Sequence, residues 1–433
     1  MNRKTRWSFI TGFDTLSLAL IIFMDPQTIL VLIVGITVLS YIFDQWLDYI
    51  NLKAQRTDIP DEIAEFYDRE RYVKSLSYHK ALTRFGFITA AFGFLLSIGM
   101  LLTGGFGWLD TSLKEFFPNE VIRALVFFGV LMLASDILTL PFQLHATFVI
   151  EERFGFNKTT RKTFYLDKLK GYMLALLMGA PLLGLLIYVV LEIGPTFWIW
   201  FSIIAAFFIL FMNMFYTSLI LPLFNKLTPL QDGELKSAIQ AFSTKVNFPL
   251  DNIFVIDGSK RSNKANAFFS GIGRKKKIVL YDTLIEKHTT EELVAVLAHE
   301  VGHFKKRHIV WGLVLSIVQI VFTLFILSLM IYNENVSVAL GSDSLSIPLN
   351  LIAFTILFSP ISGVTGLLMS MYSRKNEFEA DAYARATYSG PALMKALKTL
   401  SVDSLSNLYP HPLYVFFHYS HPPLLSRLRA LTH

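Results

Sequence analysis

The strongest constraint on the fold is a set of long apolar runs. Seven of them approach or exceed the ~20 residues that an α-helix needs to cross a bilayer. Of the 433 residues, 53% are hydrophobic, which is more than a soluble globular domain usually carries. We therefore predict a multi-pass α-helical membrane protein with about seven transmembrane helices. The predicted spans are residues 28–47, 85–103, 124–143, 171–191, 197–222, 309–332 and 349–371.

The N-terminal stretch 8–24 is also apolar, but it is short and carries Asp14. No small-residue cleavage site follows it, so a cleavable signal peptide is not predicted. The stretch could cross the membrane as an eighth span or lie on the bilayer surface as a helix. The sequence leaves both alternatives open.

Lysine and arginine are distributed unevenly among the loops. Residues 49–84 carry seven of them and residues 151–170 carry six. The segments poor in these residues are 104–120, 192–196 and 333–348. Cytoplasmic loops of membrane proteins are enriched in lysine and arginine. We therefore expect the basic segments, which include 223–308 and the C-terminal tail, on the cytoplasmic side of the endoplasmic reticulum or of a bacterial inner membrane.

The formal net charge of +6 suits loops that lie beside anionic lipid. No basic cluster is interleaved with stacking aromatic residues in a recognisable module, so we expect the lipid bilayer and no nucleic acid as a partner. The chain contains no cysteine. Disulfides, iron–sulfur clusters and thiol catalysis are therefore excluded, and any zinc site must use histidine and carboxylate ligands.

The most informative motif is H-E-x-x-H, formed by His299, Glu300 and His303. Thr289 and Glu292 have the spacing of a capping box, which predicts a helix that begins there. Residues four apart on a helix face the same way, so both imidazoles can bind one metal ion. A helix with two stray histidines is the alternative, but burying these groups without a metal or partners would be costly.

A catalytic zinc usually takes a third protein ligand. His308 follows His303 by five residues, whereas the extended zinc motif needs six and a glycine, so we place His308 at the membrane boundary instead. Glu377 and Asp381 are four apart, and Glu377 could bind the metal while Asp381 accepts a hydrogen bond from a ligand histidine. Glu379 would point elsewhere. A solvated acidic helix start explains the same residues, and this segment alone leaves both interpretations open.

Short strands are predicted at residues 252–257 and 277–281. Between them, residues 266–269 could form an edge strand along which a peptide substrate adds by backbone hydrogen bonds. An ordinary hairpin explains the same pattern. The sequence therefore predicts a small β-sheet and leaves its role open.

Together the motifs resemble those of the type I CAAX prenyl endopeptidases, a family of integral membrane zinc proteases. The resemblance extends from about residue 40 to the C-terminus. Its motifs are E-E-x-x-G-F-N at 151–157, S-K-R-S at 259–262, N-A-F-F at 266–269, H-E-x-G-H at 299–303, S-R-x-x-E-F-x-A-D at 373–381 and H-P-P-L-x-x-R-L at 421–428. Lys264 is a departure, because the family pattern has a histidine there.

The resemblance implies one Zn²⁺ per chain, bound by His299, His303 and Glu377. It implies that Glu300 is the general base and that Asp381 supports the metal ligands through hydrogen bonding. It also implies seven helices around a water-filled chamber, capped by a mainly helical zinc-protease domain that contains the small sheet.

The resemblance further implies that His421 faces the site and helps to bind the substrate or to stabilise the reacting carbonyl. Without it, His421 would be interpreted as a turn residue before two prolines. We assign substrate binding to Asn266, Ala267, Phe268 and Arg427.

We divide the chain into four parts. They are a membrane region with five spans at 1–222, a cytoplasmic catalytic segment at 223–308, the last two spans at 309–371, and a C-terminal catalytic segment at 372–433 that supplies the third ligand. Asp136 lies inside a predicted span, where an ionisable group faces protein or water, so we expect it in the chamber wall.

The predicted function is that of a membrane zinc metalloendopeptidase of the CAAX type. The resemblance implies cleavage of a C-terminal tripeptide that follows a prenylated cysteine in a peptide or protein substrate. A broader quality-control protease without prenyl dependence is the close alternative, and a heat-shock-type membrane metalloprotease would have fewer spans. A non-enzymatic scaffold or transporter would leave the zinc ligands unexplained.

Overall fold

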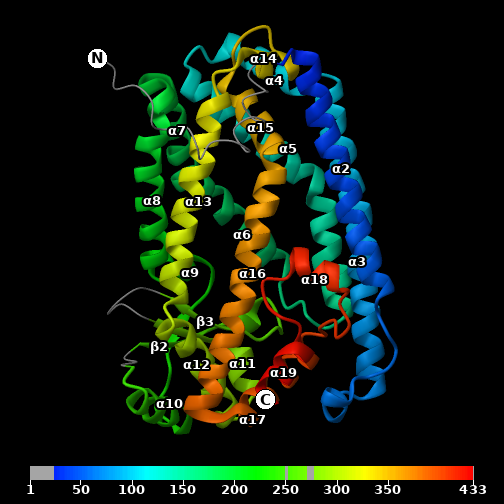
Figure 1. Cartoon of the computed structure of the whole chain (residues 1–433), viewed down its shortest axis with the longest axis vertical. Helices are drawn as coiled ribbons and strands as arrows, with labels where there is room; N and C mark the ends of the chain where they lie inside the picture. The colour runs from blue at the N-terminus through cyan, green and yellow to red at the C-terminus, as the bar shows by residue number, and fades with distance from the viewer. Residues whose placement is uncertain (1–23, 249–251, 271–276, 433) are drawn as a thin grey trace, which may run out of the picture.

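A computed structural model of the chain describes residues 24–248, 252–270 and 277–432. Long helices run along the long axis of the molecule, and the strands lie at one end with several short helices, while other short helices lie at the opposite end (Figure 1). The helices that precede the sheet are α2 (Pro26–Lys53), α3 (Arg69–Leu102), α4 (Gly105–Phe116), α5 (Glu120–His145), α6 (Arg161–Leu174), α7 (Ala180–Ile193), α8 (Phe197–Phe215) and α9 (Leu221–Phe224). The later helices are α10 (Glu234–Lys245), α11 (Asp282–Lys287), α12 (Thr290–Lys305), α13 (His308–Met330), α14 (Glu334–Ala339), α15 (Ile347–Leu357), α16 (Ser359–Ala384), α17 (Gly390–Asp403), α18 (Pro412–His418) and α19 (Leu424–Thr432).

The predicted multi-pass helical fold is confirmed. Within the described residues, five helical stretches are long and apolar enough to cross a membrane, or six if a bent pair counts as one span. They are Pro26–Lys53, Arg69–Leu102, Glu120–Glu151, Arg161–Phe224, His308–Met330 and the bent pair α15–α16. All seven predicted runs overlap these stretches, because Arg161–Phe224 contains two of them. Residues 8–23 of the candidate eighth span lie outside the described residues.

Two local features interrupt the spans. Gly194 has a positive φ of 71°, which is easy for glycine, and a 3₁₀ turn at Gly194–Thr196 separates α7 from α8. The run 349–371, predicted as one span, is instead bent by 52° between α15 and α16. Pro360 lies in the first turn of α16, where its ring and its missing N–H prevent a continuous helix.

The membrane helices share one buried core on their inner sides. Ile33 of α2, Phe127 of α5, Phe197 of α8 and Leu349 of α15 are all fully buried in it. Many apolar side chains on the outer sides remain exposed, as expected where helices contact lipid. The packed inner sides therefore join these helices in one bundle.

A four-stranded sheet lies at the end of the molecule that carries α12. Its order is β1-β2-β4-β3, with β1 (Leu227–Pro229), β2 (Ile253–Ile256), β3 (Ala267–Ser270) and β4 (Lys277–Tyr281). β2 and β4 pair in parallel, and the two outer strands pair antiparallel with their neighbours. The two predicted strands and the strand between them are confirmed. β1 was not predicted, because it is only three residues long and contains a proline.

β3 forms one edge of this sheet. The backbone carbonyl of Asn266 accepts a hydrogen bond from Tyr281 N over 3.1 Å, which sets the alternation of the antiparallel ladder. It follows that the peptide N–H and C=O groups of Ala267 and Phe269 point away from β4. In the part of the chain that the structure describes, no strand pairs with this edge.

Candidate metal centre

Helix α12 carries the H-E-x-x-H motif and begins where the sequence predicts. Thr289 Oγ1 accepts a hydrogen bond from Glu292 N, and the Glu292 carboxylate accepts one from Thr289 N, both over 3.3 Å. The apolar side of the helix, which includes Leu293 and Val301, is buried against the sheet and α17. The capping box and this buried side together hold α12 in place.

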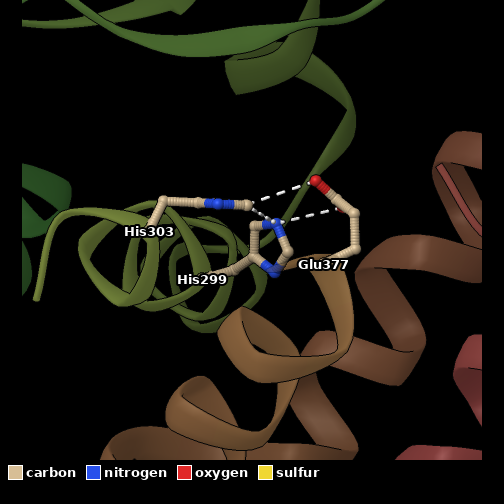
Figure 2. Close-up of side chains that lie close together, drawn as sticks. All are labelled: His299, His303 and Glu377. Carbon is tan, nitrogen blue, oxygen red and sulfur yellow. Dashed lines mark hydrogen bonds and ion pairs between the residues drawn. The ribbon is translucent and has the colours of Figure 1, made fainter. Parts of the chain in front are cut away.

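Helix α16 brings the third side chain to the two imidazoles (Figure 2). The Nε2 atoms of His299 and His303 are 3.1 Å apart. The Glu377 carboxylate lies 3.5 Å from His299 Nε2 and 3.3 Å from His303 Nε2. The three side chains are 9%, 17% and 6% exposed in the order His299, His303, Glu377. Among the described residues, this is the group whose ligand atoms could hold a metal ion, since all lie within 4.8 Å of one another.

A glycine allows the two helices to come this close. A β-carbon at Gly302 would lie 3.1 Å from Cα of Ala380 and 3.1 Å from Cβ of Tyr383. Any larger residue would push α16 away from α12. The glycine in the motif is therefore explained by the approach that brings Glu377 to the histidines.

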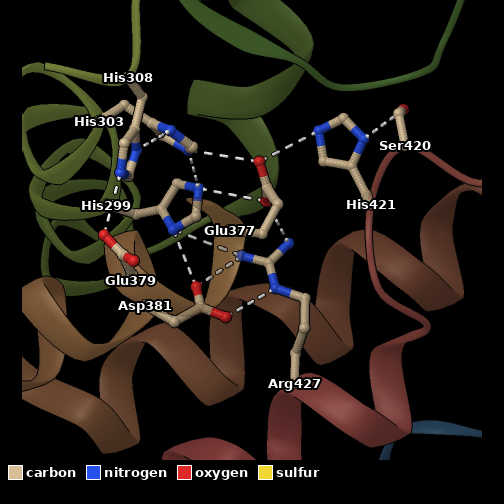
Figure 3. Close-up of polar contacts among 9 residues, drawn as sticks. All are labelled: His299, His303, His308, Glu377, Glu379, Asp381, Ser420, His421 and Arg427. Carbon is tan, nitrogen blue, oxygen red and sulfur yellow. Dashed lines mark hydrogen bonds and ion pairs between the residues drawn. The ribbon is translucent and has the colours of Figure 1, made fainter. Parts of the chain in front are cut away.

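Asp381 and Arg427 surround His299 on its other side (Figure 3). His299 Nδ1–H donates to Asp381 Oδ1 over 2.8 Å. Arg427 donates to the same carboxylate over 2.8 and 2.6 Å, and its Nη1 lies 3.4 Å from Glu377. The hydrogen bond from His299 to Asp381 is the contact that the predicted supporting role requires. Arg427 is only 12% exposed and faces the two carboxylates, so its contacts favour a positioning role over the predicted substrate contact.

The electrostatics of the site suit a cation. Burial lowers the pKa of His299, but its hydrogen bonds with Asp381 and Glu377 raise it to about 9. A divalent cation placed between the imidazoles would displace that proton, as metal binding generally does. Two imidazoles and one carboxylate are a known ligand set of catalytic zinc, so these residues fit the metal that the motif predicts.

Two further predicted residues lie beside this group. Burial raises the pKa of Glu300, which follows His299 on α12. A carboxylate with a raised pKa is better matched to proton transfer near neutral pH. His421 Nε2 lies 3.4 Å from the Glu377 carboxylate, and the His421 side chain is 64% exposed. It can therefore contact both the site and a bound molecule.

The predicted substrate-binding strand is fixed next to the metal helix. Ala267 and Phe269 pack against the core that contains α12, and the ring of Phe269 stacks on Phe304, which follows His303. Phe268 packs on the other face of the sheet, and Asn266 is exposed. β3 is thus packed beside α12, the helix that carries His299 and His303.

Two contacts near the site were not predicted. His308 is the first residue of a candidate span, as expected, but it is also buried, and its Nδ1 lies 3.0 Å from His303 Nδ1. Glu379 lies outside the His-His-Glu group, as expected, and its carboxylate contacts His308 Nε2 over 3.3 Å. The helix spacing carried no sign of these contacts, because they depend on how the chain turns between α12 and α13.

Lys264, the departure from the family pattern, links two of the motifs. Its Nζ lies 3.0 Å from the Tyr78 hydroxyl and 3.2 Å from the carboxylate of Glu151, the first residue of the E-E-x-x-G-F-N segment. It also lies 4.5 Å from the centre of the Phe156 ring. The Lys264 ammonium group therefore contacts both α3, which carries Tyr78, and the E-E-x-x-G-F-N segment.

A bundle of membrane-spanning helices that ends in a buried His-His-Glu group defines a multi-pass membrane metalloprotease. Comparison with known proteins narrows this class. The family model described as CAAX prenyl protease N-terminal, five membrane helices, matches residues 48–226, and the model for peptidase family M48 matches residues 229–433. The chain belongs to the CAAX prenyl endopeptidase family.

Individual relatives match over nearly their whole length. A CAAX prenyl protease 1 homolog of Arabidopsis thaliana is 35% identical, over 92% of this chain and 96% of the relative. CAAX prenyl protease 1 of Saccharomyces cerevisiae is 34% identical, over 92% of this chain and 94% of the relative. The crystal structure of S. mikatae Ste24p superposes with a TM-score of 0.88 at 32% identity, covering 94% of this chain and 99% of that one.

Proposed function

We propose that this membrane CAAX-type protease is a zinc endopeptidase that cleaves near the C-terminus of prenylated peptides or proteins. The observation that carries the proposal is the group formed by His299, His303 and Glu377, whose ligand atoms lie within 4.8 Å of one another. The names of its relatives support the substrate class.

The proposed mechanism assigns the chemistry to residues around that group. A bound zinc ion would supply Lewis acidity and lower the pKa of water. Glu300 takes a proton from the attacking water and delivers it to the leaving amine. His421, exposed beside Glu377, donates a hydrogen bond to the carbonyl oxygen as negative charge develops on it. Asp381 and Arg427 hold His299 and Glu377 in place.

The peptide is proposed to bind along β3. The N–H and C=O groups of Ala267 and Phe269 point to the free edge, where the Ala267 N–H donates to Asn266 Oδ1 over 2.8 Å. An extended peptide that displaces this side-chain contact can add there as a further strand. Backbone pairing of this kind makes little demand on the substrate's sequence. Packing of Phe269 on Phe304 fixes the strand relative to His303.

We propose that the site faces the cytoplasm and that the helices enclose a wet chamber. The lysine- and arginine-rich segments 49–84 and 151–170 lie toward the end of the molecule that carries α12, whereas α4 and α14 lie at the opposite end (Figure 1). Inside the bundle, Asp136 of α5 accepts hydrogen bonds from Lys168 Nζ over 2.6 Å and from Gln143 Nε2 over 3.1 Å. This partly exposed polar group needs water access rather than lipid.

The four parts of the chain are proposed to form two structural units. Helix α12 of segment 223–308 packs on α16 and α17 of the C-terminal part, so the two catalytic segments form one unit. The spans of 1–222 and 309–371 form the other unit, because α8 packs on α13 and α2 on α15.

A single assay tests the proposed substrate class. A farnesylated C-terminal peptide and its unmodified twin are incubated with the purified full-length protein, with and without a zinc chelator. We expect faster cleavage of the farnesylated peptide and loss of both activities in chelator. Equal turnover of the two peptides would instead support the alternative function, a membrane quality-control protease.

A further inference from the structure

His303 is held differently from His299. Asp381 contacts His299 directly, whereas His303 contacts a second imidazole (Figure 3). The Nδ1 atoms of His303 and His308 are 3.0 Å apart, and the two rings are steeply inclined at 73° with centres 5.1 Å apart. Arg307, with a φ of 60°, reverses the chain between α12 and α13, which places buried His308 over His303.

A cation bound by the His-His-Glu group would determine which ring nitrogens carry protons. His303 Nε2 lies 3.1 Å from His299 Nε2 and 3.3 Å from Glu377, so it would offer its lone pair to that cation. The proton of a neutral imidazole then sits on Nδ1, which donates to His308 Nδ1. His308 in turn carries its proton on Nε2 and donates to Glu379 Oε2 over 3.3 Å.

We propose that His308 and Glu379 are positioning residues that fix the tautomer and the ring orientation of His303. His299 contacts the Asp381 carboxylate directly. His303 contacts the Glu379 carboxylate only indirectly, through His308. Support of this kind raises the basicity of the ligand and orients it toward the metal. The inference rests on the proposed metal site.

The far end of this chain of contacts reaches solvent. Glu379 is 38% exposed and lies 3.8 Å from the exposed side chain of Lys375. His308 and Glu379 both line a cavity of about 490 Å³ between α13 and α16, together with Trp311 and Tyr372. Replacing Glu379 therefore leaves no buried charge without a partner, so a loss of zinc affinity could not be attributed to an unpaired buried charge.

The test measures zinc affinity of the full-length protein by competition with a chromophoric chelator, together with the absorption spectrum of the Co²⁺-loaded protein and its thermal unfolding. His308→Leu should weaken zinc binding by about 10–100-fold and alter the Co²⁺ spectrum, as loss of an outer hydrogen-bond partner typically does. Glu379→Gln should weaken binding less. His308→Gln should restore part of the affinity, because its amide oxygen can accept from His303 Nδ1–H. Lys375→Ala serves as the matched control and should bind zinc as the wild type does.

Wild-type affinity and an unchanged Co²⁺ spectrum in both His308→Leu and Glu379→Gln would overturn the proposal. If His308→Leu fails to fold, Glu379→Gln decides alone, because the Glu379 side chain is 38% exposed and its replacement should not prevent folding. A wild-type protein that binds no zinc would instead overturn the proposed metal site, and the two failures are therefore distinguishable.

Discussion

Replacing Asp381 with asparagine keeps the shape of the side chain and removes its charge. In the wild type, this carboxylate accepts a hydrogen bond from His299 over 2.8 Å and two from Arg427 over 2.8 and 2.6 Å. The side chains of Asp381 and Arg427 are 2% and 12% exposed. The change therefore disturbs a metal ligand and a buried ion pair at once.

The structure sets the size of both effects. Removing one partner of a buried ion pair costs about 3–5 kcal/mol when the other charge is left alone. Because Glu377 still lies 3.4 Å from Arg427, we expect the lower end, about 3 kcal/mol of lost stability. Loss of an outer hydrogen-bond partner lowers metal affinity by about 10–100-fold, or roughly 1.4–2.8 kcal/mol.

Chelator competition measures the affinity, and thermal unfolding of the metal-free protein reports the stability. Asp403→Asn makes the same chemical change at a carboxylate that pairs with Arg71 and Lys287, whose side chains are 45% and 31% exposed. This control should cost less than about 1 kcal/mol and leave zinc affinity unchanged. Wild-type zinc affinity in Asp381→Asn would refute the role assigned to Asp381, even if the variant were less stable.

Three further outcomes follow from the structure. Glu300→Gln should retain zinc and lose at least about 100-fold in kcat for peptide cleavage, because the base that activates water is gone. Wild-type turnover in this variant would exclude Glu300 as that base. Ala267→Pro removes an N–H that points to the free edge of β3, so peptide cleavage should fall about 3–10-fold. The control variant Ala267→Ser should cleave normally. Equal cleavage by both variants would contradict docking along β3. Burial lowers the pKa of His288 below 6.5, so the folded protein favours the neutral ring and loses stability as the pH falls below about 6.5. His288→Gln should therefore flatten the acid side of the profile of Tm against pH. An unchanged slope in this variant would contradict the contribution of His288.

The sequence predicted the parts of the molecule that local rules determine. A bilayer requires a fixed length of apolar helix, so the spans could be located from composition alone. The bend between α15 and α16 was not predicted, although Pro360 was its visible signal. His299 and His303 could be placed together because residues four apart share a helix face.

The rest of the site depends on packing between distant segments. Glu377 meets the histidines only because Gly302 lets α16 approach α12, and the family resemblance, not the spacing, made its role specific. Arg427 contacts Asp381 across the packed end of the molecule, and no rule of spacing predicts that pair. His308 turns back onto His303 because of the backbone at Arg307, whose positive φ is invisible in the residue type.

We propose that two histidines on α12 and a glutamate on α16 hold one zinc ion for peptide hydrolysis. Metal analysis of the purified wild type beside Glu377→Ala, with peptide cleavage measured on the same samples, tests it most directly. We predict one zinc per chain and cleavage in the wild type, and loss of both in the variant while its thermal unfolding remains cooperative. Full zinc occupancy in Glu377→Ala, or cleavage by a wild type that contains no metal, would contradict the account.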